Sequence, residues 1–210
     1  YRLTELKNKQ SFSIKEKSLM DVLATGIKYA PTIISGVDEA KLVMRTADRF
    51  FNFDSYKQAD MIIKSALKLI SDAYSPSILT LSTFESGTRA EESTQRAAEV
   101  TRNKDINPFL DLYERVLLPS EQWEDYDLVG ISIVGISQIL PGLTLARLLK
   151  EKYQHLHITL GGPIFSVNAR QLLDHPEFFQ DFCHSIVTFE GEEPLHRLLT
   201  TLKKGSALKE

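Results

Sequence analysis

Three short apolar segments, separated by segments with helical spacing, constrain the fold of this chain more than any other feature. They cover residues 127–134 (DLVGISIV), 157–160 and 185–189. The first is too short and too rich in isoleucine and valine for a helix, and its uniformly apolar character is typical of the buried centre of a parallel sheet. Residues 140–153 carry leucines at helical spacing, and the same spacing predicts that Arg147 can reach water. This alternation predicts an α/β fold with a parallel sheet flanked by helices.

Consecutive parallel strands joined by helices cross over with a right hand, so the segments that leave them gather at one edge of the sheet. Ligands of open α/β sheets bind at this carboxyl edge. The sequence therefore predicts a site built from small, polar and acidic residues that follow the three strands. They are Ser132, Val134, Gly135, Ser137, Gln138, Gly161, Gly162, Pro163, Glu190, Gly191 and Glu192.

Several of these motifs also have a purely structural interpretation. Gly161 and Gly162 suit a tight turn equally well, or a close approach of the backbone to a ligand, because glycine has no Cβ. Ser137 fits an N-cap of the following helix. Gln138 could direct its carboxamide into the cleft. Carboxylates such as Glu192 are favourable at the start of a helix, whereas Glu190 precedes the helix and could accept hydrogen bonds from a ligand.

The remaining sequence predicts a helical segment over residues 1–75, a polar connection over 76–106 and the α/β domain over 107–210. Within the first segment, periodic apolar residues predict helices over 14–30, which Pro31 should end, over 35–51 and over 54–74. Asn107 and Pro108 predict the start of a helix, as N-cap and first helical residue.

Composition argues against several classes of function. The net charge of −3 gives no basis for nucleic-acid binding, and no apolar run reaches the ~20 residues needed to cross a membrane. The single cysteine, Cys183, cannot form an internal disulfide, and we expect a buried thiol in a cytoplasmic protein. The five histidines are scattered, so neither a metal site nor a catalytic residue is predicted. Walker-type and GxGxxG motifs are absent from the sequence.

Several pieces together resemble a known family. They are NPFL from Asn107, DLVGISI from Asp127, Gln138, LARLLK from Leu145, LGGP from Leu160 and EGE from Glu190. In order and spacing, this set is similar to the cobalamin-binding domain of radical S-adenosylmethionine enzymes, over about residues 107–199. Residues 38–82 resemble, less closely, the helical insertion that such proteins can carry.

The resemblance implies a Rossmann-like (flavodoxin-like), doubly wound sheet that holds the nucleotide tail of cobalamin at its carboxyl edge. Ser132 and Val134 would correspond to the family's Ser-x-Leu element, and Gly161 and Gly162 to its Gly-Gly element. The chain departs from the family in three respects. The Asp-x-His-x-x-Gly motif is absent, the first strand is expected upstream of residue 1, and the CxxxCxxC motif of the radical domain is missing.

The resemblance thus implies an accessory domain that binds cobalamin and has no activity by itself. Methyl transfer or radical rearrangement would need S-adenosylmethionine and a [4Fe-4S] cluster, both held by a radical domain of the same polypeptide. One alternative is a cobalamin-free module of the same fold that docks the radical domain or a peptide substrate. A second alternative is an unrelated flavodoxin-like enzyme or signalling domain, although the acidic cluster of a signalling receiver is missing.

Overall fold

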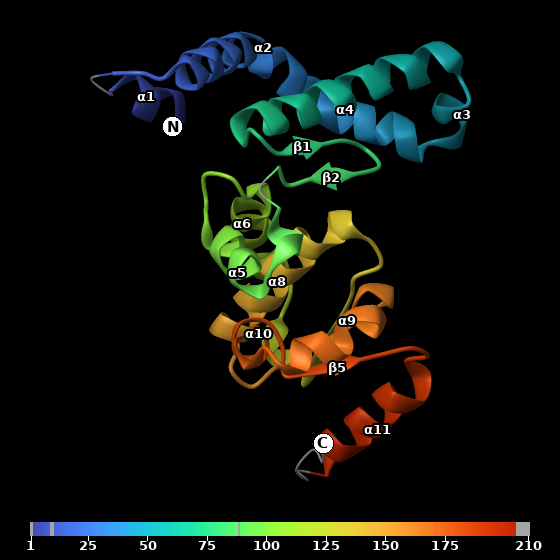
Figure 1. The fold of residues 1–210 in the computed structure, drawn as a ribbon. Helices are drawn as coiled ribbons and strands as arrows, with labels where there is room; N and C mark the ends of the chain where they lie inside the picture. Colours follow the sequence, from blue (N-terminus) through green and yellow to red (C-terminus); the bar gives the residue numbers. More distant parts are fainter. Residues whose placement is uncertain (1, 9–10, 88, 205–210) are drawn as a thin grey trace. The chain divides into compact units, whose positions relative to one another are not determined.

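The computed structural model describes residues 2–8, 11–87 and 89–204 (Figure 1). The chain divides into two compact units, residues 1–88 and 89–210. This division falls inside the segment 76–106, for which the sequence predicts a polar connection. Each unit is described by itself.

The N-terminal unit is a pair of long helices with a small hairpin. Its elements are α1 (Arg2–Lys7), α2 (Ile14–Arg45), α3 (Ala47–Phe50), α4 (Phe53–Ala73), β1 (Ile78–Leu79) and β2 (Phe84–Glu85). A capping box formed by Ser13 and Glu16 begins α2. Buried Ala40, Val43 and Ala59 join the two long helices. The strands β1 and β2 pair antiparallel.

Pro31 does not end a helix, so the prediction of two helices over 14–30 and 35–51 is wrong. Pro31 lies inside the single 32-residue helix α2. A proline removes one backbone hydrogen bond, and packing against a neighbouring helix can compensate for this loss. Here a Cβ on Gly26 would lie 3.1 Å from Leu69, and one on Gly36 would lie 3.2 Å from Ile62. The helix α4 therefore supports α2 closely on both sides of the proline.

The C-terminal unit alternates strands and helices. Its helices are α5 (Thr94–Arg102), α6 (Pro108–Leu112), α7 (Leu118–Ser120), α8 (Ile139–Lys152), α9 (Pro163–Leu173), α10 (Pro176–Asp181) and α11 (Glu192–Lys203). A π-helical turn, Tyr113–Leu117, joins α6 to α7. The strands β3 (Leu128–Ser132), β4 (His157–Gly161) and β5 (Ser185–Val187) form a parallel sheet in the order β3-β4-β5. The structure confirms a mixed α/β architecture with a parallel sheet flanked by helices.

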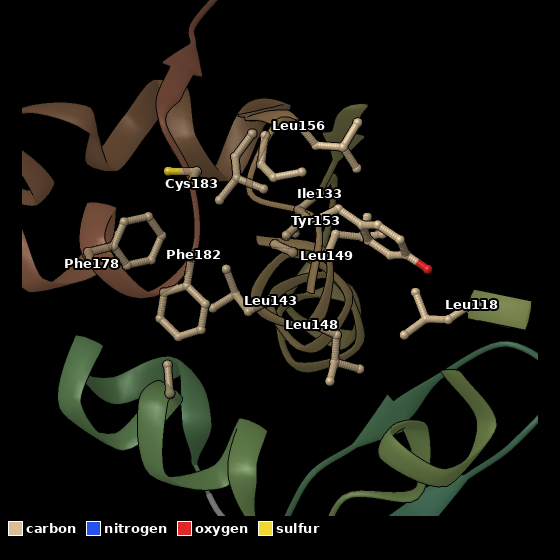
Figure 2. Packing of buried hydrophobic residues seen from close by; sticks show 14 of the residues in the cluster. Leu118, Ile133, Leu143, Leu148, Leu149, Tyr153, Leu156, Phe178, Phe182 and Cys183 are labelled. Carbon is tan, nitrogen blue, oxygen red and sulfur yellow. The ribbon is translucent and has the colours of Figure 1, made fainter. Parts of the chain in front are cut away.

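One face of this sheet packs on the main hydrophobic core (Figure 2). Side chains alternate between faces along a strand. Ile158 and Leu160 of β4 are fully buried beside Leu149 of α8 and Phe182. Cys183 belongs to the same core, and burial raises the pKa of its thiol to about 12, so the thiol stays protonated. Residues of β4, α8, α9 and α10 contribute to this core, and so do Ala97 of α5, Leu110 of α6 and Leu118 of α7.

The first strand differs from its sequence prediction. Residues 127–134 predict a strand in the buried centre of a sheet, but β3 lies at the edge of the described sheet and β4 lies at its centre. Gly130 and Ser132 of β3 are exposed, while Val129 and Ile131 pack on the core. The apolar run therefore reflects one buried face, and the small residues between the apolar ones occupy the other.

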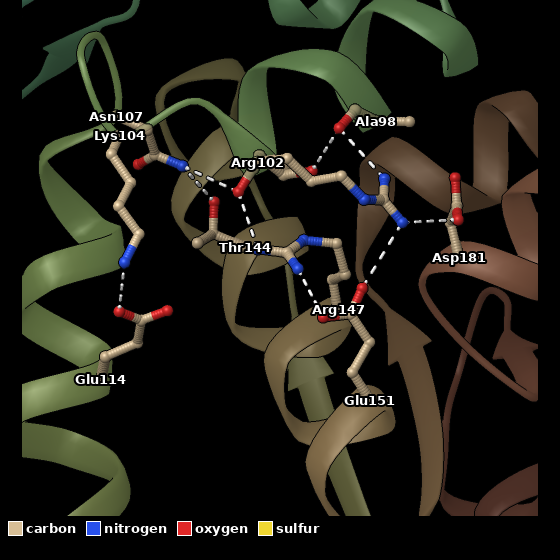
Figure 3. A network of polar contacts seen from close by, with 10 residues as sticks. Ala98, Arg102, Lys104, Asn107, Glu114, Thr144, Arg147, Glu151 and Asp181 are labelled. Atoms are coloured by element: carbon tan, nitrogen blue, oxygen red, sulfur yellow. Dashed lines mark hydrogen bonds and ion pairs between the residues drawn. The ribbon is translucent and has the colours of Figure 1, made fainter.

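A buried polar network joins α5 to α8 (Figure 3). The side-chain amide of Asn107 donates to the carbonyls of Val100 and Thr101 and to Thr144 Oγ1, at 3.4, 3.5 and 2.9 Å. Its oxygen accepts from the Phe109 N–H, which confirms Asn107 as the predicted N-cap.

Arg147 belongs to the same network and is buried, contrary to the prediction from helical spacing that it can reach water. Its guanidinium donates to the Thr101 carbonyl at 2.8 Å and to Glu151 at 2.6 Å. The first of these bonds satisfies a backbone carbonyl at the end of α5 and thereby ties α5 to α8 within the C-terminal unit.

Replacement of Asn107 by aspartate should destabilise the chain by at least ~2 kcal/mol, because a buried carboxylate can still cap Phe109 but cannot donate to three oxygens. Asn103→Asp is the matched control, since the exposed Asn103 side chain accepts from the Asp105 N–H, as an aspartate can. Urea denaturation monitored by circular dichroism would measure both. Equal effects of the two substitutions would contradict a donor role for Asn107.

Candidate functional site

The predicted site residues lie at the carboxyl ends of the three parallel strands. Ser132 ends β3, and Gly161 ends β4. Gly162 and Gly191 are the N-caps of α9 and α11. The remaining members occupy the same turns: Val134 and Gly135 follow β3, Ser137 and Gln138 lie in the 3₁₀ turn Ile136–Gln138, Pro163 and Glu192 begin α9 and α11, and Glu190 follows β5. The parallel strand order brings these turns to one edge, which we call the carboxyl edge.

Small residues line the carboxyl half of the second sheet face, which lies opposite the core. The register pairs Gly130 with Thr159 and Ser132 with Gly161. A Cβ on Gly161 would lie 3.4 Å from the Val187 carbonyl, and one on Gly130 would lie 3.6 Å from Thr159. Gly130, Ser132 and Gly161 therefore form a flat floor almost without side chains. Gly130 was missed by the site prediction, although a glycine inside a strand is itself a signal of close approach.

Gly162 meets the chain's own backbone. Its φ is +106°, and a Cβ there would lie 2.4 Å from the Ile133 carbonyl oxygen. The Ile133 N–H also donates to the Gly161 carbonyl at 2.8 Å. The two glycines that the sequence treats as one motif thus have different surroundings. Gly162 permits a tight backbone contact, whereas Gly161 forms part of the floor.

Of the two polar side chains Ser137 and Gln138 after β3, Gln138 is the one that hydrogen-bonds within the turn. The Gln138 carboxamide oxygen accepts from the Val134 N–H at 2.8 Å, so it folds back onto its own loop and away from the expected position in a cleft. Ser137 makes no N-cap bond, because α8 begins after Gln138. The reason is the 3₁₀ turn, which moves the helix start beyond Ser137.

Apolar side chains are exposed on the outgoing loops. Val134 and Ile136 after β3 are 59% and 66% exposed, and Phe189 after β5 is 80% exposed. Phe189 has a positive φ of 58°, and its N–H donates to Ser166 Oγ at 2.8 Å, which fixes the loop to α9. No sequence signal identifies Ser166, since the contact depends on tertiary structure.

The acidic residues of the last loop are divided between two roles. Arg197 pairs with Glu193 at 2.7 Å, and this hydrogen bond lowers the pKa of the Glu193 carboxyl. Glu190 and Glu192 are exposed at the carboxyl edge. Both carboxylates are therefore accessible to hydrogen-bond donors.

Histidines gather at the opposite, amino edge of the sheet. The rings of His157 and His184 lie 5.1 Å apart between centroids. His184 Nδ1 accepts from the Ile158 N–H at 2.9 Å, and His157 Nε2 lies 2.8 Å from Ser185 Oγ. Burial, the charge of Lys150 and the neighbouring His157 lower the pKa of His184 to about 4. Burial and Lys150 also lower the pKa of His157.

Comparisons with known proteins give no family for this chain, so its function has to be argued from the geometry of the site. A scan of protein-family models, a search of curated proteins and a search of solved structures each found no match. Over residues 2–8, 11–87 and 89–204, His, Cys, Asp and Glu side chains form no group of three or more that could hold a metal ion. No helix in these ranges is long and apolar enough to cross a membrane.

Replacement of Gly162 by alanine should lower the free energy of unfolding by at least ~2 kcal/mol, because the new Cβ would collide with the Ile133 backbone at a strained φ. The matched control is Gly135→Ala, where nothing lies within 4 Å of the added Cβ. Chemical denaturation of the two variants would measure the difference. A Gly162→Ala chain as stable as Gly135→Ala would show that the contact is not tight.

The low pKa of His184 predicts a loss of stability in acid. The folded-state pKa of about 4 lies below the usual 6.5, so the unfolded chain binds the proton first as pH falls. Stability from this residue is fully present above pH 6.5 and is lost as pH falls through about 4. Urea denaturation between pH 7 and 4 should show a shallower decline in His184→Asn than in the unchanged chain. Parallel declines would contradict the lowered pKa.

Proposed function

We propose that this chain is a cobalamin-binding accessory domain with a Rossmann-like sheet, cytoplasmic and without catalysis of its own. The observation that carries the proposal is the floor of Gly130, Ser132 and Gly161 beside the shared carboxyl edge. A large, flat cofactor tail needs a surface that backbone atoms alone can form. The register and the missing Cβ atoms provide such a surface at the edge where α/β sheets bind ligands.

The residues present fit the tail of a corrinoid. Gly130, Ser132 and Gly161 would lie under it, and Ser132 could hydrogen-bond it through the hydroxyl. Glu190 and Glu192 could accept hydrogen bonds from the amide groups of a corrinoid. Cobalamin, when bound, supplies the cobalt chemistry of methyl transfer or radical rearrangement, and this chain binds and orients it. S-adenosylmethionine and a [4Fe-4S] cluster would belong to a radical domain of the same polypeptide.

A second candidate function is a cobalamin-free docking module. The exposed Val134, Ile136 and Phe189 favour it, because apolar side chains gathered on loops often mark an interaction surface. The partner would be the radical domain or a peptide substrate. The two candidates differ in whether the glycine floor or the apolar loops carry the binding.

The test is retention of hydroxocobalamin by the purified chain after desalting, measured by the visible spectrum. We expect retained colour in the unchanged chain. Gly130→Val and Gly161→Val should each weaken retention at least ~10-fold while they change the free energy of unfolding by less than ~1 kcal/mol. The reason is that an added Cβ makes only van der Waals contacts, 3.6 Å from Thr159 at Gly130 and 3.4 Å from the Val187 carbonyl oxygen at Gly161. Leu173→Ala, an exposed residue at the far end of α9, is the control and should retain the colour.

A colourless unchanged chain with a native circular dichroism spectrum would overturn the proposal. Retention that is insensitive to both valine substitutions would also contradict the use of the floor. Loss of retention in Phe189→Ser, with both valine variants still coloured, would assign binding to the apolar loops.

A further inference from the structure

The amino edge of the sheet carries a cavity that the proposed function does not use. Its volume is ≈ 760 Å³, and its lining includes Asp127, His157 and His184 together with Leu199, Leu202 and Lys203 of α11. This volume lies within the range of ~300–1,000 Å³ that is common for small-molecule sites. Because it lies at the end of the sheet opposite the carboxyl edge, any ligand here would be separate from a corrinoid.

The hydrogen bonding of His184 determines which of its two ring nitrogens carries the proton. Its Nδ1 accepts from the backbone N–H of Ile158, so the lone pair is on Nδ1 and the proton is on Nε2. The lowered pKa agrees with a neutral ring. His184 Nε2–H is thus a hydrogen-bond donor for which the structure records no acceptor in residues 89–204.

The hydroxyl groups of Thr159 and Ser185 determine which ring nitrogen of His157 carries the proton. Thr159 Oγ1 donates to the Ser185 carbonyl at 3.3 Å, and Ser185 Oγ donates to Thr159 Oγ1 at 3.0 Å. The single hydroxyl proton of Ser185 is therefore used, and His157 Nε2 must donate to Ser185 Oγ. His157 Nδ1 is left as an acceptor, and Ser185 is not activated as a nucleophile.

This arrangement favours an organic ligand over a metal ion. A metal needs the lone pair of a neutral imidazole nitrogen, but His184 Nε2 carries a proton. Within the described residues, the side chains at this edge form no group that could hold a metal. What the two rings provide is one donor, His184 Nε2–H, and one acceptor, His157 Nδ1, on rings whose centroids lie 5.1 Å apart.

We propose that this cavity binds an amino-substituted nitrogen heterocycle that carries one anionic group, as an adenine nucleotide does. A ring nitrogen accepts from His184 Nε2–H, and the adjacent amino group donates to His157 Nδ1. The heterocycle turns its edge toward the two imidazoles and its face toward the apolar Leu199 and Leu202. The anionic group pairs with the exposed ammonium of Lys203.

Two substitutions remove the proposed contacts and keep the internal bonds. In His184→Asn, the amide oxygen replaces Nδ1 as acceptor from Ile158, and the Nε2 donor is lost. In His157→Gln, the amide nitrogen replaces Nε2 as donor to Ser185, and the Nδ1 acceptor is lost. His196→Ala, an exposed histidine of α11, is the matched control.

The probe is adenosine 5′-monophosphate, titrated into the intact chain by calorimetry. We expect saturable binding that weakens at least ~10-fold in each of His184→Asn and His157→Gln, and that is unchanged in His196→Ala. Lys203→Gln should weaken binding of the monophosphate but not of adenosine, and inorganic phosphate alone should bind more weakly than the monophosphate. Nitrogen-15 spectra of the imidazoles should show shifts of His157 and His184 on binding.

Absence of saturable binding, or equal affinities in the two histidine variants and the control, would overturn the proposal. Equal binding of inorganic phosphate and the monophosphate would reduce the site to a surface contact of Lys203 and would also overturn it. Hydroxocobalamin retention should be unchanged in both histidine variants, so failure here is distinguishable from failure of the proposed corrinoid site.

Discussion

The backbone contact between Gly162 and Ile133 is the constraint on which the C-terminal unit depends. The Ile133 N–H reaches the Gly161 carbonyl at 2.8 Å, and a Cβ on Gly162 would lie 2.4 Å from the Ile133 oxygen. This contact holds the turn after β3 against the start of α9. The carboxyl ends of β3 and β4 are thereby fixed side by side, and the floor of small residues follows from that register.

The two faces of the sheet carry different kinds of side chain, and so do its two edges. One face is apolar and closed by the helices, and the other carries glycine, serine and hydroxyl groups. On the second face, the carboxyl half is flat because Gly130 and Gly161 lack side chains. The amino half carries His157, whose proton is fixed by Ser185 and Thr159. Two kinds of ligand could therefore use one sheet without competing for space.

Sequence reasoning predicted the features that follow from local periodicity. The order of strands and helices from β3 to α11, the helix α4 and the Asn107 N-cap are all present in the structure. It failed where contacts between distant parts of the chain determine burial or helix length. Helical spacing predicts an exposed Arg147, but Arg147 is buried and donates to the Thr101 carbonyl. Pro31 lies in an uninterrupted helix, which α4 approaches closely at Gly26 and Gly36 on either side of the proline.

The sequence predicts which loops form the candidate site, but it does not predict the contacts of the individual residues in them. Parallel topology assigns the turns to one edge, but it does not reveal that Gln138 bonds its own loop or that Gly162 meets Ile133. The histidine pair was not predictable either, because His157 begins β4, His184 directly precedes β5, and the sequence does not specify the register of these two strands.

Hydrogen–deuterium exchange with and without hydroxocobalamin tests the central claim most directly. The account predicts that the cofactor slows exchange in the three outgoing segments, residues 130–138, 161–163 and 187–192, and leaves residues 154–157 and 184 at the amino edge unchanged. Unchanged exchange throughout, or protection confined to the amino edge, would contradict it.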